Sequence, residues 1–335
     1  MVLITLNDLI HKKAFPLQKN IKMENMIIEN KSLFQGQNVL IIGNGFDLDL
    51  ELKTSYNNFY ESNFWPFREP NTLMGVFLEQ ERNINNWMDL EEKIGEYAIR
   101  SYVGDIVTQK HYHQKNKEDF DRIVSNLGKF LSISENGAIN KNSTASKVLS
   151  AQLKSHSIPE IITFNYTSIK KIAQRLDIQT VFTPYHIHGS LLDNNIILGV
   201  GEKYSYNNFK LPETNDFFYK TSSPQYDPPQ IAEILDKATK ITFFGLSLGG
   251  MDAPYFSGLF QNLSKQVGKT ITFFTFDDRS RLQILRHLRS VEGINLNDVW
   301  TRHRFEFIRT KDNVDEAKVS NYIQRLDIHN VELDI

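Results

Sequence analysis

The chain has 335 residues, and its 38 Lys and Arg against 40 Asp and Glu give a formal net charge of −2. This balance excludes a protein that binds nucleic acid through bulk positive charge, so nucleic acid is not expected as the main ligand. With 40% hydrophobic and 23% charged residues, the composition is typical of a folded globular protein. The absence of cysteine excludes disulfides, thiolate nucleophiles and cysteine-ligated metal sites.

The N-terminal residues 1–36 show no clear period and are interpreted as an extension, with Met26 as a candidate start. Their apolar residues precede their lysines, the reverse of a secretory signal. No apolar run in the chain approaches the roughly 20 residues that cross a bilayer. The sequence therefore predicts a cytoplasmic protein that makes no membrane contact.

Short apolar runs along the chain predict buried strands of a mainly parallel sheet. The strong runs are residues 38–42, 161–164, 241–244 and 270–276, and the weaker ones are 180–182, 196–198 and 304–308. Each strong run ends in small or polar residues, so we expect a loop at its carboxyl end, where open α/β sheets bind ligands.

Helical periodicity fills the space between the first two strong strands, with apolar faces that start at Leu73, Leu90 and Phe120. Further helices are predicted at 231–240 and 281–288. The predicted fold is α/β, a Rossmann-like mainly parallel sheet flanked by helices, with an inserted helical subdomain. The predicted domains are a core of residues 37–60 plus 157–310, a helical insertion at 61–156, and a C-terminal helix or tail at 311–335.

A glycine-containing loop, residues 43–47, follows the first strand directly. Gly43 and Gly45 would let the backbone approach a ligand, and the next helix would present its amides to a phosphate. The dinucleotide-binding fingerprint requires a third glycine, where this chain has Leu48. A purely structural turn is the alternative interpretation.

Two further candidate sites follow predicted strands. Asn165 is either a helix cap, a role that Thr167 can also fill, or a carboxamide that points into a cleft and holds a water. His186 and His188 stand two residues apart, so they can share a face of a strand. They are interpreted as polar edge residues, as a metal pair, or as a site in which His188 is a general base. No third ligand is evident, so no metal site is predicted.

The G-x-S-x-G pattern of residues 245–249 matches the nucleophile elbow of serine hydrolases, with Ser247 as nucleophile. Asp277 or Asp278 can supply the acid. The base is the weak point, because His287 comes only about ten residues later, and Pro254 is tolerated only in the first turn of a following helix.

A helix start is predicted after Trp87, where Asp89 and Glu92 fit a capping box. Glu91 is then either part of the structural cap at the start of this helix or a side chain that reaches the cleft from the insertion.

The order of these stations resembles the AbiH-type bacterial abortive-infection family and, more remotely, the sirtuin-like NAD-binding superfamily. The resemblance covers residues 37 to 280, and it is strongest at the glycine loop, at Asn165 and its neighbours, and at His188-Gly189-Ser190. Glu51 and Lys53 depart from the pattern, because most of the family has glycine and proline there. The sirtuin zinc module is absent, as the lack of cysteine requires.

The resemblance implies roles for individual residues. Asn165 would place the attacking water, and His188 would be the catalytic histidine. Gly43 and Gly45 would approach the diphosphate, Gly245 and Ser247 would contact the cofactor, and Asp277 would meet the adenosine ribose. The residues expected to bind the nucleotide are Gly43, Asn44, Gly45, Phe46, Asp47, Ser55, Tyr56, Tyr166, Thr167, Gly189, Gly245, Ser247 and Asp277.

The function that this resemblance implies is an antiphage effector that binds NAD and hydrolyses its nicotinamide–ribose bond. NAD would be a substrate rather than a prosthetic group, with a phage-derived trigger and a homo-oligomer as expected partners. One alternative is a sensor that binds NAD or an ADP-ribose-like nucleotide without turnover. Another is a serine hydrolase that uses Ser247.

Overall fold

The computed structural model describes residues 37–84, 89–100, 106–155, 157–202, 204–206, 209–210, 213–228, 230–249, 251–291 and 294–328. The predicted N-terminal extension, Met26 and Trp87 lie outside these ranges. The chain divides into two units, residues 1–37 and 38–335, and nearly all the described residues belong to the second.

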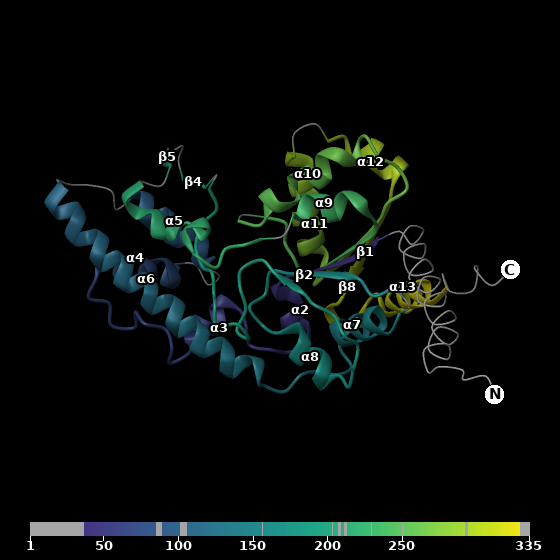
Figure 1. Ribbon diagram of the computed structural model, residues 1–335, viewed down its shortest axis with the longest axis horizontal. Coiled ribbons are helices and arrows are strands. Elements are labelled where there is room, and N and C mark those ends of the chain that lie inside the picture. The colour runs from purple at the N-terminus through teal and green to yellow at the C-terminus, as the bar shows by residue number, and fades with distance from the viewer. Residues whose placement is uncertain are drawn as a thin grey trace, which may run out of the picture. The chain divides into compact units, whose positions relative to one another are not determined.

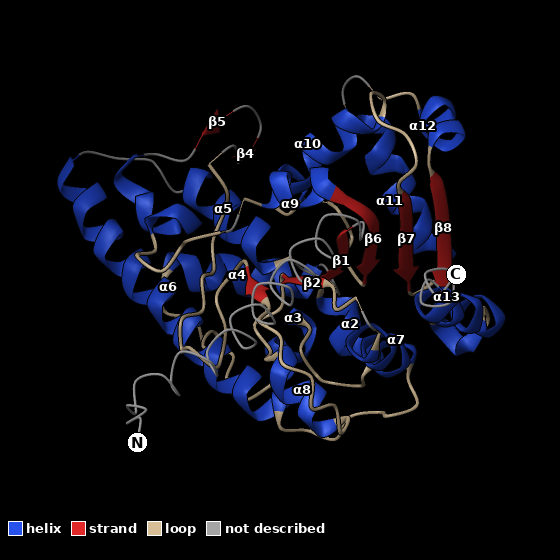
Figure 2. Ribbon diagram, turned by 45° about the vertical axis from the view of Figure 1, so that its right-hand side comes forward, coloured by secondary structure: helices blue, strands red, loops and turns tan. Residues whose placement is uncertain are grey.

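A six-stranded sheet forms the centre of this unit (Figure 2). Its strands lie in the order β3-β2-β1-β6-β7-β8. They are β1 (Gln37–Ile42), β2 (Glu160–Thr163), β3 (Tyr185–His186), β6 (Ala238–Phe244), β7 (Thr270–Thr275) and β8 (Arg304–Arg309). The pairs β1–β2, β2–β3, β6–β7 and β7–β8 are parallel. Counted along the chain, this is the 3-2-1-4-5-6 order of Rossmann folds, which confirms the predicted fold class.

Helices cover both faces of the sheet (Figure 1). One face packs on α2 (Asn44–Asp49), α7 (Thr144–Lys154), α8 (Ile169–Arg175) and α13 (Glu316–Ile328). The other packs on α9 (Ile231–Lys237), α10 (Ala253–Leu263), α11 (Asp278–Ser290) and α12 (Leu296–Arg302). The strands are apolar on both faces, as β1 shows with Leu40 and Ile42 toward one cluster and Val39 and Ile41 toward the other. This double burial is why continuous apolar runs predicted the strands.

A third hydrophobic cluster lies in a helical region beside the sheet. It contains α3 (Tyr56–Glu61), α4 (Leu73–Ile84), α5 (Leu90–Arg100) and α6 (Ile106–Glu135), together with Leu198, Val200 and Phe218 from the chain after β3. That later stretch also carries a two-stranded antiparallel sheet, β4 (Ser205–Tyr206) with β5 (Phe209–Lys210), and short 3-10 turns at Glu213–Phe218 and Lys220–Ser222. A last 3-10 turn, Lys311–Asn313, precedes α13. The predicted domain boundaries stay a prediction, although α7 packs on the sheet rather than in this cluster.

Two weaker strand predictions are wrong. Residues 180–182 form a loop in which Val181 is 92% exposed, and the edge strand β3 begins only after Pro184. Residues 196–198 are also a loop. Their backbone partners are not a strand, because the Ile197 amide donates to the His188 carbonyl and the Ile197 carbonyl accepts from the Tyr166 hydroxyl. At residues 196–198, burial without a neighbouring strand therefore produced the misleading apolar pattern.

The end of α2 explains what Glu51 does to the fold. Leu52 N–H donates to Asp47 C=O and Glu51 N–H to Leu48 C=O, which is the Schellman pattern of helix termination. Glu51 has φ 67°, a left-handed conformation that favours glycine. The departure from the family pattern at this position thus places a strained side chain where glycine fits.

We therefore expect Glu51→Gly to stabilise the protein by about 0.5–1 kcal/mol, because relief of left-handed strain outweighs the entropy of a free glycine. Urea unfolding measures the change. The substitution also removes the hydrogen bond from Asn140 Nδ2 to Glu51 Oε1 (2.9 Å). Asn140→Ala removes this bond together with the one that Asn140 Oδ1 accepts from Asn142 N–H (3.0 Å), so it gives an upper limit for the cost of the contact. If Glu51→Gly loses more stability than Asn140→Ala does, Glu51 is not strained in the folded protein.

Candidate functional site

A cavity of about 160 Å³ opens at the carboxyl ends of β1, β2 and β6, against the helical region. In Rossmann folds this end of the sheet, where the strand order reverses, is where ligands bind. The predicted site residues that line the cavity are Asn44, Asp47, Tyr56, Asn165, Tyr166, Thr167, His188 and Ser247. The other lining residues are Thr54, Asp89, Glu91, Leu127, Leu131, Phe164, Leu246, Gly249, Met251 and Asp252.

A second hollow of about 140 Å³ adjoins the cavity and shares Leu246 and Ser247 with it. Gly45 and Gly245 line this second hollow. The predicted residues Gly43, Phe46, Ser55, Gly189 and Asp277 line neither hollow. Ser55 and Phe46 have structural roles instead. The Ser55 hydroxyl caps α3 by accepting from Asn58 N–H, and Phe46 is fully buried against Phe244.

The glycines hold two loops in direct backbone contact. The amide of Gly43 donates to the Phe244 carbonyl, and that of Gly45 to the Gly245 carbonyl, both at 2.9 Å. A Cβ added to Gly45 would lie 2.6 Å from Gly245 Cα. These two amides are therefore committed to the neighbouring loop, whereas Asn44 N–H has no protein partner among the described residues. The glycines let the ends of β1 and β6 meet.

Gly189 has its own steric requirement. Its φ is +74°, and a Cβ at this position would lie 1.8 Å from the Asn195 carbonyl oxygen. The tight turn after His188 needs glycine, so the His-Gly-Ser sequence reflects backbone geometry.

Asn165 is fixed in the cavity wall by its amide nitrogen. Nδ2 donates to the Gly43 carbonyl (3.1 Å) and to Asp47 Oδ1 (2.9 Å), and the side chain is 95% buried. Among the described residues, no protein group donates to its Oδ1, so this oxygen is left as an acceptor at the cavity wall. The arrangement suits a carboxamide that accepts from a water, as the second of the two sequence interpretations requires. Helix α8 is capped by Ser168 instead, so neither Asn165 nor Thr167 is its N-cap.

Asp47 lies beneath Asn165 and is almost completely buried. Besides Asn165, the Thr167 hydroxyl donates to it at 2.8 Å. Burial raises the pKa of Asp47 to about 7, against the opposing effect of these two donors. Between about pH 4 and 7, the Asp47 carboxyl group is therefore protonated in the folded protein and ionised in the unfolded chain.

This difference predicts a pH dependence of stability. The raised pKa means that Asp47 binds more protons in the folded state than in the unfolded state between pH 4 and 7, so its contribution to stability falls as pH rises through this window. Glu91 and Asp252, with pKa values raised to about 7 and about 6, add in the same direction. The lowered pKa of His188 acts in the opposite direction. We expect Asp47→Asn to remove a share of the slope on the order of 1 kcal/mol per pH unit.

Urea unfolding at pH 5, 6 and 7 tests this expectation. Asp121→Asn, which removes an exposed carboxylate from α6, is the control that leaves the slope in place. An Asp47→Asn variant with the wild-type slope would show that Asp47 ionises in the folded state as it does in the unfolded chain.

His188 is 95% buried, and its environment is polar on one side and aromatic on the other. Its Nε2 lies 3.0 Å from Lys220 Nζ and 3.8 Å from Asp252 Oδ1. Phe164 packs edge-on against the ring. Burial, and secondly the Lys220 charge, hold the pKa of His188 well below its ordinary value. The imidazole is therefore neutral at neutral pH.

Lys220 and Glu91 form a buried ion pair behind His188, with Nζ 3.1 Å from Oε2. Lys220 is 2% exposed and Glu91 7% exposed. Glu91 Oε1 also accepts from the Gly199 amide (3.3 Å). The interpretation in which Glu91 reaches the cleft is confirmed, and Asp89 caps α5 by accepting from the amides of Glu91 and Glu92.

Lys220 and Asp252 are site residues that the sequence analysis did not single out. Asp252 lies three residues after the G-x-S-x-G pattern of residues 245–249, so its nearness to that pattern was the available signal for it. Lys220 lies among polar and aromatic residues of irregular structure, where no period or spacing marks a buried cation.

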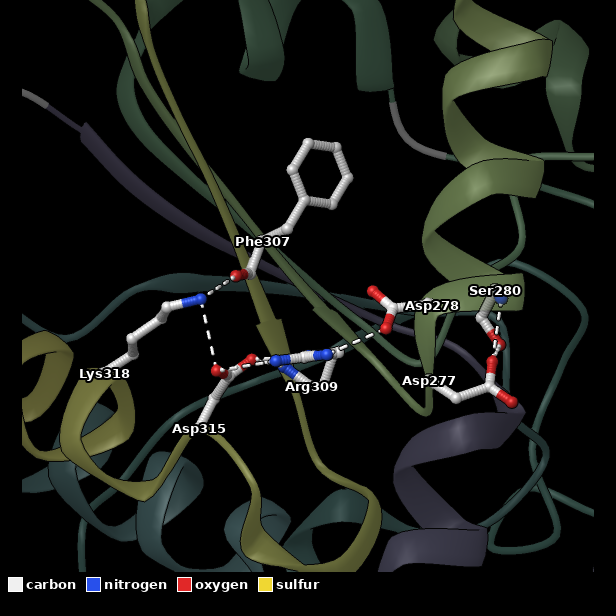
Figure 3. Close-up of polar contacts among 7 residues, drawn as sticks. All are labelled: Asp277, Asp278, Ser280, Phe307, Arg309, Asp315 and Lys318. Carbon is white, nitrogen blue, oxygen red and sulfur yellow. Dashed lines mark hydrogen bonds and ion pairs between the residues drawn. The ribbon is translucent and has the colours of Figure 1, made fainter.

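Asp277 caps α11 at the end of β7 (Figure 3). Its Oδ1 accepts from the Ser280 amide (2.8 Å) and hydroxyl (2.9 Å), and these bonds lower the pKa of Asp277. Asp278, the next residue in the chain, is bridged to Asp315 by Arg309 (Figure 3). Ser280 lines the second hollow. Asp277 is therefore close to that hollow, with its contact to an adenosine ribose still a prediction.

Ser247 is exposed, and its hydroxyl accepts from the Gly249 amide at 3.4 Å. Helix α10 begins only at Ala253, with Pro254 in its first turn, so the serine is not on a tight strand-to-helix elbow. Among the described residues, no histidine contacts its hydroxyl.

The part of the chain that the structure describes also has no cluster of three metal-ligating side chains. Within that part, no helix combines the length and the apolar character needed to span a membrane.

A comparison with protein-family models matches residues 39–274 to the family described as bacteriophage abortive infection AbiH. The matched region begins in β1, ends in β7 and contains every residue that lines the cavity. No curated protein sequence matches the chain significantly.

Proposed function

We propose, from the premise that the chain belongs to the AbiH family of bacteriophage abortive infection proteins, that it binds NAD and hydrolyses the nicotinamide–ribose bond. One observation carries the proposal. Asn165 and His188 follow different strands, yet they line one cavity at the carboxyl end of a Rossmann-order sheet. The remoter sirtuin-like resemblance assigns NAD chemistry to these two positions.

The reaction needs few groups. Water attacks the anomeric carbon of the nicotinamide ribose, the bond to nicotinamide breaks, and ADP-ribose, nicotinamide and a proton result. Nicotinamide carries the positive charge before cleavage and leaves neutral, so no strong general acid is required. The transition state resembles an oxocarbenium ion, as in glycoside hydrolysis. Asn165 Oδ1 would accept from the attacking water, and His188 would take its proton.

The charges of the cavity suit this end of the substrate. Its lining contains the carboxyl groups of Asp47, Asp89, Glu91 and Asp252, and in the part of the chain that the structure describes no Lys or Arg side chain lines it, with Lys220 behind His188. At neutral pH the carboxylate of Asp252, whose pKa is raised only to about 6, favours a cationic nicotinamide ring and a developing oxocarbenium ion over a diphosphate. The second hollow, which is lined by Ser247, Ser280 and Thr310 among others, is where we place the adenosine half.

Purified protein with NAD tests the proposal. We expect release of free nicotinamide, with His188→Gln slower by about 100-fold, the range for loss of a general base, and Ser247→Ala cleaving NAD at an undiminished chemical rate. Retained NAD binding in His188→Gln separates lost chemistry from lost folding. Ester hydrolysis abolished by Ser247→Ala, without NAD cleavage in any variant, would establish the serine hydrolase instead.

A second candidate is a nucleotide sensor that binds NAD or ADP-ribose without turnover. It is favoured by the contact of His188 Nε2 with Lys220, because that contact occupies the nitrogen on which a base depends. Saturable NAD binding by calorimetry, with no nicotinamide released by wild type or by any activated form, would establish it. The phage-derived trigger and the homo-oligomer stay predictions.

A further inference from the structure

Lys220 is the least expected residue at the site, because a buried lysine costs free energy unless its charge is matched. Its backbone is held in place. Lys220 N–H donates to the Val200 carbonyl, and Val200 N–H to the Phe218 carbonyl. Only the side chain can therefore move easily, and its ammonium group has two described partners, Glu91 Oε2 and His188 Nε2.

The direction of the Lys220–His188 hydrogen bond follows from the chemistry of the two groups. An ammonium group has only donors, so Nε2 must be the acceptor. A neutral imidazole that accepts at Nε2 carries its hydrogen on Nδ1. Its one ring lone pair then points at Lys220 Nζ, and a general base needs this lone pair to take a proton.

We propose that Lys220 masks His188: its ammonium group occupies the Nε2 lone pair in the resting protein, and the base becomes available only when Lys220 shifts onto Glu91. The proposal rests on the proposed function in that His188 is the base whose exposure matters. An effector that must stay inactive before infection would thereby be inhibited by a residue of its own site.

The position of Glu91 suggests where the restraint is released. Glu91 is on α5 of the helical region, whereas His188 follows β3 of the sheet. Lys220 lies between them, bonded to both. A movement of α5 toward or away from the sheet would change the balance between the two bonds of Lys220. The helical region is thereby coupled to the imidazole through one side chain.

Asp252 and several other titratable groups also lie near His188. Asp252 Oδ1, at 3.8 Å, is too distant for a hydrogen bond. Among the described residues, the phenols of Tyr166 and Tyr255 lie next to the ring, and the other titratable groups that line the same cavity are Tyr56, Asp47, Asp89 and Glu91. Lys220 is the only side chain in hydrogen-bond contact with Nε2 among the described residues.

The test compares two variants so that the loss of Lys220 is separated from the loss of Glu91. Lys220→Met alone would leave Glu91 buried and unpaired and can unfold the protein. The reference is therefore Glu91→Gln, which keeps the lysine on His188 but removes its carboxylate partner. Urea unfolding first establishes that this variant is folded, and wild type is the second reference. The double variant Glu91→Gln/Lys220→Met removes the lysine without creating an unpaired buried carboxylate.

The first readout is the ¹⁵N NMR spectrum of histidine-labelled protein without NAD. Nine histidines make the His188 signals assignable by comparison with His188→Gln. We expect wild type and Glu91→Gln to carry hydrogen on Nδ1 with Nε2 unprotonated throughout the neutral range. In the double variant, the His188 pKa should rise. A proton on Nε2 in wild type would overturn the proposal whether or not NAD is cleaved.

The second readout is basal nicotinamide release. The double variant should exceed Glu91→Gln by about tenfold or more, because a hydrogen bond to a charged group no longer has to be broken. Equal or slower release in the double variant, with NAD binding intact, would show that Lys220 assists rather than masks the base. If no form cleaves NAD, the proposed function fails and the mask on catalysis fails with it, whereas the NMR result still decides the Lys220–His188 contact.

Discussion

Replacement of Asn165 by alanine should lower nicotinamide release from NAD by about 100-fold or more, the factor that follows when a reacting group is misplaced by about 1 Å. The reason is geometric. Asn165 Nδ2 is tied to Gly43 and Asp47, which directs the free Oδ1 into the cavity. Alanine removes the acceptor that would place the water. NAD binding, measured by calorimetry, should be largely retained, since most of the expected contacts to the nucleotide lie elsewhere.

A matched control exists at Thr167. Both Asn165 and Thr167 donate a hydrogen bond to the buried Asp47, but Thr167 acts through a hydroxyl already committed to that bond. Thr167→Val therefore reproduces the loss of a donor to Asp47 and keeps the carboxamide. If Thr167→Val slows NAD cleavage as much as Asn165→Ala does, Asn165 acts through the Asp47 network and not through a water.

Gly245→Ala should destabilise the protein strongly, by about 3 kcal/mol or more. Gly245 has φ +66°, and a Cβ there would lie 2.4 Å from Gly45 C and Phe46 N. Left-handed strain and overpacking against backbone both oppose the methyl group. The neighbouring loop cannot shift cheaply, because the Gly45 amide is hydrogen-bonded to the Gly245 carbonyl.

Gly258→Ala is the comparison for this variant. Gly258 is inside α10, and a Cβ there would meet nothing within 4 Å. The same chemical change should stabilise the protein there by about 0.5–1 kcal/mol, because alanine favours helices. Similar unfolding free energies for the two variants in urea would refute the close contact between the ends of β1 and β6.

The sequence was most informative where one physical requirement dominates. The strands buried on both faces produced uninterrupted apolar runs, and the glycine loops required the absence of a side chain, so β1, β2, β6 and β7 and the positions of the loops were predictable. Asn165 and His188 were found because each follows a strand or a turn at the expected edge of the sheet. These signals are local, and they survive in a single sequence.

The remainder depends on contacts between segments that are distant in the chain. Nothing near Lys220 indicates that its ammonium group will meet Glu91, which is 129 residues away. The commitment of the Gly45 amide to Gly245 also depends on the pairing of two loops, so the sequence suggested a phosphate contact where the structure has a loop-to-loop bond. The false strand at 196–198 arose in the same way, from burial by the helical region rather than by a sheet.

Hydrolysis of NAD in ¹⁸O-labelled water tests the central claim most directly, because it reports which bond breaks and what attacks it. We expect free nicotinamide together with an equal amount of ADP-ribose that carries one labelled oxygen at the anomeric carbon of the former nicotinamide ribose. Products that carry the label on phosphorus would place the cleavage at the diphosphate. NAD recovered intact from a saturated, folded protein under activating conditions would show that the cavity binds the dinucleotide and performs no chemistry on it.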